Sequence, residues 1–170
     1  MNGAAHAGLT IALLACAGFG CASTPPAAPS SGGCAVDLWI ISWNADDAGV
    51  NDEQEAIDHP EVHERVETCS YADAVRGWLE HAPAKTIKQP EKGVDVSPDL
   101  RVVARVTSGH GSDLVGVNGS CDWVRRNRKQ YLEYDPSLFN ILIQPLQGAA
   151  RHELDIYLSH PGCGPKAAPH

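Results

Sequence analysis

The first 33 residues limit what this chain can fold into more than any other feature. Residues 9–20 form an apolar run that contains Cys16, and Cys21 follows the run directly. Residues 22–33 are rich in Pro, Ser, Ala and Gly, a composition typical of a flexible linker. The apolar run is too short to span a bilayer and leads into this tether. We therefore expect the folded part of the chain to begin at Cys34.

The order of apolar core, small residue, Cys and tether resembles a bacterial lipoprotein signal, in which the Cys is lipidated and becomes the mature N-terminus. Two lipidation sites compete. Residues 13–16 match the lipidation motif better, whereas lipidation at Cys21 leaves a more normal apolar core and removes Cys16 with the signal. Because Cys21 also leaves an even number of Cys, we favour it, with residues 1–20 as the signal and residues 21–33 as the tether.

The start of the chain departs from a normal signal in one respect. The first eight residues contain no Lys or Arg, where a signal usually carries a positive charge. A non-lipidated signal cut after residue 17 therefore stays open, and so does a buried N-terminal helix.

Residues 34–163 have the length of one domain with a core of its own, and we expect residues 164–170 to form a loose tail. The chain has 21 acidic and 13 basic residues, for a net charge of −8. Most acids lie between residues 37 and 99, where fifteen accompany five basic residues. An acidic chain is poorly suited to neutralise phosphates, so we expect no nucleic-acid partner.

Four Cys are spread through the expected domain: Cys34, Cys69, Cys121 and Cys163. In an exported protein this pattern predicts two disulfides, with three pairings open. No Cys-x-x-Cys motif is present, which excludes a zinc ribbon and a thioredoxin-like motif. Since Cys34 precedes the first expected strand and Cys163 follows the last, we favour Cys34–Cys163 and Cys69–Cys121.

Hydrophobic periodicity predicts both strands and helices. We expect strands at residues 36–43, 100–107, 114–117, 138–146 and 153–159. We expect a helix that begins at Ser70, is capped with the help of Asp73 and is ended by Pro83. A second, amphipathic helix is expected at residues 122–134, with its Arg and Lys side chains on a solvated face. Residues 44–58 read as an acidic loop and residues 61–68 as a helical turn.

These elements predict an α+β domain supported by disulfides. The expected order is strand, helix, two strands, helix and two strands. It favours an antiparallel or mixed sheet of about five strands with two helices. A ferredoxin-like split βαβ arrangement is the nearest familiar topology.

The string Ser108-Gly109-His110-Gly111-Ser112 follows an apolar strand directly. It resembles the segment that carries the catalytic His of metacaspase-like cysteine peptidases. The resemblance implies a small cysteine hydrolase with His110 as base and Cys121 as the activated nucleophile. The alternative, which we favour, is an ordinary hairpin turn in which Gly adopts the left-handed backbone conformation.

Residues 44–55 partly match a calcium-binding loop. Asn44, Asp46, Gly49 and Glu55 fall at the first, third, sixth and twelfth positions of the EF-hand pattern, where oxygen ligands and the tight turn belong. Ala48 occupies the fifth position and has no side-chain ligand. The loop therefore predicts either a calcium- or metal-stabilised binding module or, as we favour, a solvated acidic loop.

Taken together, the sequence predicts an exported lipoprotein that is anchored in the cell envelope by its N-terminal lipid. Ala17 and Ala22 follow the two candidate Cys, and a residue other than Asp at that position is typical of outer-membrane sorting. We expect a non-enzymatic binding or structural module without a cofactor, whose partner is an envelope protein or a small ligand. The cysteine hydrolase and the metal-stabilised module remain its alternatives.

Overall fold

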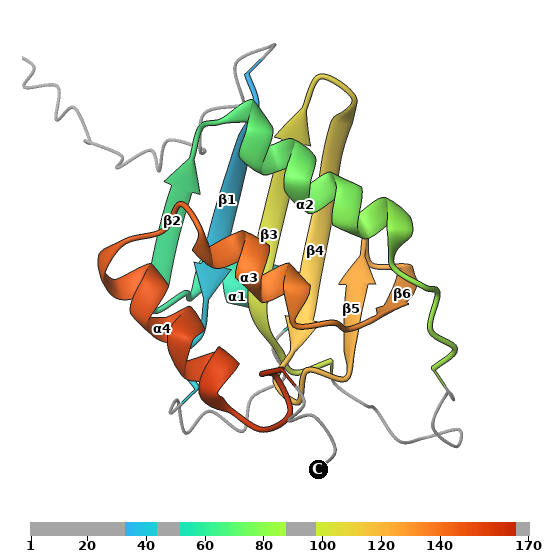
Figure 1. Cartoon of the computed structure of the whole chain (residues 1–170), viewed down its shortest axis with the longest axis vertical. Coiled ribbons are helices and arrows are strands. Elements are labelled where there is room, and N and C mark those ends of the chain that lie inside the picture. The colour runs from blue at the N-terminus through green and yellow to red at the C-terminus, as the bar shows by residue number, and fades with distance from the viewer. Residues whose placement is uncertain (1–32, 44–51, 88–97, 166–170) are drawn as a thin grey trace, which may run out of the picture.

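The computed structural model describes residues 33–43, 52–87 and 98–165. Within them the chain forms an α+β domain around one six-stranded antiparallel sheet, as the sequence predicted in class (Figure 1). The strand order is β2-β1-β3-β4-β5-β6. The strands are β1 (Ala35–Ile40), β2 (Val62–Val66), β3 (Leu100–Ser108), β4 (Gly111–Asn118), β5 (Trp123–Arg126) and β6 (Gln130–Glu133). The helices are α1 (Glu53–Asp58), α2 (Cys69–His81), α3 (Ser137–Ile143) and α4 (Gly148–Ser159).

The helices are divided unequally between the two faces of the sheet. Helices α2, α3 and α4 cover one face, and the short helix α1 lies behind the other (Figure 1). The side chains of strand β1 alternate between the two faces of the sheet, and all six of its residues are buried. Val36, Leu38 and Ile40 enter the large core under α2–α4. Trp39 belongs to a small cluster under α1.

Three predicted elements are confirmed with small shifts of their ends. They are β1, the β3–β4 hairpin and α2. The cap of α2 differs from the prediction, because Thr68 stands at the N-cap and makes no side-chain hydrogen bond there. Helix α2 ends at His81, two residues before Pro83, which cannot continue a helix.

The helix predicted at residues 122–134 is wrong, because β5 and β6 form a hairpin there. Residues 127–129 connect the strands, and Asn127 and Arg128 have φ angles of 51° and 61°. A pair of left-handed residues is the geometry of a type I′ turn, which joins twisted antiparallel strands well. Val124 and Leu132 face each other across the hairpin and fill the large core.

The two last predicted strands are also wrong, since residues 138–146 and 153–159 lie mainly in α3 and α4. Leu138, Phe139 and Leu142 are all buried, at the spacing of one helix face. Leu154 and Tyr157 repeat that pattern in α4. The residues of this region have strong β propensity, but packing of one apolar helix face against α2 and the sheet outweighs it.

The secondary structure predicted for residues 44–68 is also partly wrong. Residues 61–68 contain edge strand β2, which pairs with β1, and not a helical turn. Residues 53–58 form α1, and Asp52 is its N-cap. The Asp52 carboxylate accepts hydrogen bonds from the backbone N–H groups of Gln54 (2.8 Å) and Glu55 (2.9 Å). The rest of the predicted acidic loop, residues 44–51, lies outside the described residues.

The ferredoxin-like topology is not confirmed. Strands β2 and β3 do run parallel to each other on either side of β1, with α2 between them in the chain. A second, interlocked unit of this kind would be needed. Instead β3, β4, β5 and β6 form a meander, and α3 and α4 both follow the last strand.

All four domain Cys form disulfides, but the predicted pairing is wrong. Cys34 is bonded to Cys69 and Cys121 to Cys163, with Cα–Cα distances of 4.7 and 5.1 Å. Helix α2 starts beside the beginning of β1, which brings Cys34 to Cys69 (Figure 1). The loop after α4 returns to the turn between β4 and β5, which brings Cys163 to Cys121.

Candidate functional site

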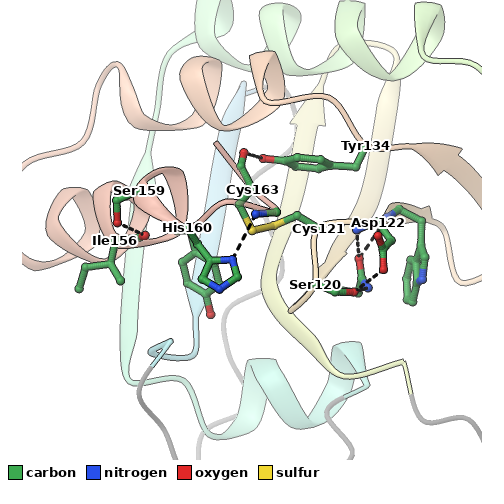
Figure 2. Close-up of a disulfide and its surroundings, with 12 residues drawn as sticks. Ser120, Cys121, Asp122, Tyr134, Ile156, Ser159, His160 and Cys163 are labelled. Atoms are coloured by element: carbon green, nitrogen blue, oxygen red, sulfur yellow. Dashed lines mark hydrogen bonds between the residues drawn. A yellow bond between two sulfur atoms is a disulfide. The ribbon is translucent and has the colours of Figure 1, made fainter. Parts of the chain in front are cut away.

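The Cys121–Cys163 disulfide joins two loops that line a surface cavity. Cys121 is 4% exposed and Cys163 is fully buried. Cys121 has a φ of 54°, a left-handed conformation that is uncommon for a side-chain-bearing residue. The disulfide joins the turn after β4 to the loop after α4, so one covalent bond positions two loops (Figure 2).

The turn after β4 is held by the buried side chain of Asn118. Its Oδ1 accepts hydrogen bonds from the backbone N–H groups of Asp122 (2.9 Å) and Trp123 (3.1 Å). Its Nδ2 donates to Ser120 Oγ at 2.5 Å, and Ser120 donates to the Asp122 carboxylate at 2.7 Å. These bonds fix Cys121 in its strained conformation and orient the Asp122 carboxylate.

The loop after α4 is held from the opposite side by Tyr134. The Tyr134 hydroxyl donates to the carbonyl of Cys163 at 2.6 Å (Figure 2). Burial raises the pKa of Tyr134 well above its ordinary value, so the phenol keeps its proton and its hydrogen bond. Gly164 is required by close packing, since a Cβ there would lie 2.2 Å from the carbonyl oxygen of Leu158.

A cavity of about 760 Å³ opens beside the disulfide. Its wall includes both loops, β6 and the start of α3. A neighbouring cavity of about 320 Å³ reaches Trp78 and His81 of α2. The two cavities share Glu133, Tyr134 and Asp135, and we call them together the β6 groove.

The β6 groove is mainly acidic at its centre. Glu133, Asp135 and Asp122 contribute carboxylates, and Lys85 contributes the ammonium group. The Lys85 ammonium donates to the backbone carbonyl of Asp122. Asp135 accepts a hydrogen bond from the Ser137 N–H at 2.8 Å, and its pKa is lowered by hydrogen bonds from the side chain and backbone of Ser137. The carboxylate of Asp135 is therefore ionised at neutral pH.

A third cavity of about 310 Å³ lies near Trp43, Tyr157 and His160. The Trp43 and His160 rings are 3.9 Å apart between centroids, and Tyr157 donates to the carbonyl of Ile41 at 2.5 Å. Its charged groups neutralise each other, since Arg101 Nε lies 2.8 Å from the Asp99 carboxylate. This cavity is smaller than the β6 groove and has no comparable excess of charge.

The structure does not bring His110 and Cys121 together. His110 is exposed in the turn between β3 and β4, whereas Cys121 follows the other end of β4. The eight residues of β4 separate them by roughly 25 Å at the usual rise of a strand. Cys121 is also bonded to Cys163 and carries no thiol for nucleophilic attack. Residues 108–111 form a hairpin turn, which was the favoured alternative to the hydrolase.

The other candidate residues fall mostly outside the described part of the chain. Cys16 and Cys21 lie there, as do Asn44 and Asp46, so lipidation and calcium binding stay predictions. Glu55 is exposed on α1. Among residues 33–43, 52–87 and 98–165, no group of three or more His, Cys, Asp or Glu side chains is placed to hold a metal ion.

The three arginines of residues 122–134 are dispersed by the hairpin and lie beside acidic side chains. Arg125 makes two hydrogen bonds to buried Glu53 of α1, at 2.7 and 2.5 Å. Arg126 points to the opposite face and makes two hydrogen bonds to Asp113, at 2.8 and 3.0 Å. Hydrogen bonding to Asp113 raises the pKa of Arg126. These arginines stabilise the fold and form no joint anion site.

Sequence reasoning missed the β6 groove. The predicted helix at residues 122–134 ends with Glu133 and Tyr134, Asp135 follows it, and Asn140 falls in a predicted strand. The groove also depends on the Cys121–Cys163 pairing, which was one of three open pairings. No local signal was available, because Pro136 is compatible with a helix that ends at residue 134.

Comparisons with family models, curated proteins and solved structures found no match to this chain. In the described residues no helix has the length and apolar character needed to cross a membrane.

Proposed function

We propose that the chain is an exported lipoprotein whose folded domain is a non-enzymatic binding module of the cell envelope. The N-terminal lipid holds it at a membrane and the tether spaces the domain from it. The ligand site is the β6 groove. An envelope protein is the expected kind of partner.

The two disulfides support export. Disulfides persist in oxidising compartments such as the bacterial periplasm and are rare in the cytosol. All four Cys of the domain are paired, and the lipoprotein-like segment lies ahead of them. Lipidation at Cys21 would leave no free thiol in the mature chain, which suits an oxidising environment.

One observation carries the binding site: the cavity of about 760 Å³ against a covalently fixed wall. Its volume lies within the usual range of ligand sites. The disulfide, the Asn118 bonds and the Tyr134 bond hold its walls before any ligand arrives. A preformed site avoids much of the ordering cost of binding.

The compartment is tested by expressing the full chain in a Gram-negative host with an alkyne-labelled fatty acid. We expect label in the membrane fraction, lost in Cys21→Ser and kept in Cys16→Ser. Non-reducing peptide mapping should return Cys34–Cys69 and Cys121–Cys163. An unlabelled chain in the cytosol with free Cys would refute the proposal.

The binding site is tested by placing a photoreactive amino acid at Asn140, an exposed residue of the groove wall. Irradiation of intact cells should give a discrete adduct, identified by mass spectrometry. The matched control carries the same group at His152, which is exposed on α4 and does not line the groove. Equal adducts from both positions, or none from Asn140, would count against the groove.

A further inference from the structure

The β6 groove joins two cavities through the residues that they share. Glu133 and Asp135 line both cavities. Pro161 and Pro165 line the first cavity only, and Trp78 and Pro83 line the second only. Apolar surface and shared carboxylates therefore lie together. This combination suits an extended ligand with a cationic group along its length.

The charged groups of the groove differ in the interactions that they already make. The Lys85 ammonium, which also lines the groove, donates to the backbone carbonyl of Asp122. Asp135 is oriented by Ser137, and Glu133 is exposed. Among the described residues, neither Glu133 nor Asp135 forms an ion pair with a basic side chain.

The aromatic residues of the groove are held in place. The Trp78 indole N–H donates to Ser137 Oγ at 3.0 Å, and Tyr134 is anchored through its hydroxyl to Cys163. Both rings line the cavities beside the carboxylates. Fixed aromatic rings next to carboxylates favour the alkyl stem and cationic head of Lys or Arg.

The edge of β6 is already covered, which restricts how a partner can bind. The N–H of Glu133 donates to the carbonyl of Pro83 at 2.8 Å, and the N–H of Lys85 donates to Tyr131 at 2.9 Å. Ala84 forms a bridge with Leu132 between them. A partner therefore cannot add a strand along this edge and must be recognised through its side chains.

We propose that the β6 groove binds an extended, basic peptide segment of a partner protein, with a Lys or Arg side chain paired to Glu133 and Asp135. The assignment rests on the proposed function of the groove as a ligand site. It adds the chemical class of the partner to that function.

The test is calorimetric titration of the full, disulfide-bonded chain with a capped tri-lysine peptide. We expect binding that weakens as salt is raised, and no binding of capped tri-glutamate. Glu133→Gln/Asp135→Asn should weaken tri-lysine binding at least about fivefold. The charge-matched control, Glu55→Gln/Asp73→Asn, removes two exposed acids outside the groove and should stay within twofold.

A second variant keeps the inference falsifiable if the double variant unfolds. Asn140→Lys adds a cation to the exposed groove wall and removes no hydrogen bond given by the structure, so it should weaken tri-lysine binding as well. Unchanged affinity in both groove variants, or an equal loss in the control, would overturn the inference. So would tighter binding of spermidine than of tri-lysine, which would indicate a free polyamine.

The two proposals can fail separately. If the photoreactive group at Asn140 gives a specific adduct while tri-lysine does not bind, the groove is a ligand site for another chemical class. The basic-peptide inference is then wrong and the proposed function stands. If neither experiment gives a signal from the groove, both are wrong.

Discussion

The two disulfides close opposite ends of the sheet and differ in their surroundings. Cys34–Cys69 lies where β1 and α2 begin, at the end that also contains the His110 turn. There Cys69 is exposed and Cys34 half-buried. Cys121–Cys163 lies at the other end, where both residues are buried beside the β6 groove. The more exposed bond joins regular elements, and the buried bond joins two loops.

Loop entropy does not distinguish the two bonds. They close segments of 35 and 42 residues, and the chain-entropy relation gives about 4 kcal/mol for each. Any measured difference must therefore come from packing and from the loops that each bond positions. Two cross-links of similar loop length therefore differ in effect: one joins regular elements, and the other positions loops that line a cavity.

The largest effect is expected from Cys121→Ala/Cys163→Ala. This variant loses the loop constraint and two buried sulfurs, so its free energy of unfolding should fall by about 5 kcal/mol. Urea unfolding followed by tryptophan fluorescence measures the change. The loops around the groove should also gain hydrogen exchange. Full protection of the 160–164 amides in the variant would show that the disulfide does not hold the groove.

Removal of the more exposed bond should have a smaller effect. Cys34→Ala/Cys69→Ala should lower the free energy of unfolding by about 4 kcal/mol, because little apolar packing is lost. The same urea experiment checks it, and the groove amides should keep their protection. A larger loss here than in Cys121→Ala/Cys163→Ala would reverse the comparison.

The sequence predicted β1, β3, β4 and α2 better than the segments that follow β4. Strands β1, β3 and β4 have apolar patterns typical of buried strands, and α2 has a helical pattern with Pro83 after it. Local patterns decide such elements. The disulfide-forming residues were predictable from their number and from export, but their pairing depends on how α2 and α4 pack.

The β5–β6 hairpin was not predicted because its pattern fits two structures. Val124 and Leu132 are eight residues apart, so they would share one face of a helix and can equally pair across a hairpin. The left-handed pair Asn127 and Arg128 decides for the hairpin, and Arg is an unusual residue there. The groove itself is formed by segments distant in the chain, and no local motif announces it.

Two glycine substitutions compare how closely the loop after α4 and helix α2 are packed. Gly164→Ala places a Cβ against a backbone oxygen beside the buried disulfide, and we expect a loss of about 3 kcal/mol. Gly77→Ala in α2 meets no heavy atom within 4 Å and should stabilise the domain by about 0.5 kcal/mol. Thermal unfolding measures both. Similar melting temperatures for the two variants would contradict the close packing of the loop after α4.

A further effect concerns charge at the end of the sheet opposite the groove, and it is smaller than the loss expected from Gly164→Ala. Burial opposes ionisation of Asp113, but hydrogen bonds from Arg126 and Asn127 outweigh it and lower the pKa of Asp113. A carboxylate with a lowered pKa stabilises the fold fully above its unfolded pKa, and this contribution is lost as the pH falls through the folded pKa. Asp113→Asn should therefore cost about 2 kcal/mol at pH 7 and much less once the pH has fallen below the folded pKa of Asp113.

Urea unfolding of the wild type and Asp113→Asn between pH 7 and pH 2 measures this difference. Asp73→Asn, at an exposed position of α2, is the matched control and should follow the wild type at every pH. A constant gap between the wild type and Asp113→Asn across this range would mean that packing, and not the charge of Asp113, stabilises the His110 end. That end would then resemble the groove end, where buried contacts and a buried disulfide hold the loops, and the contrast between the two ends would disappear.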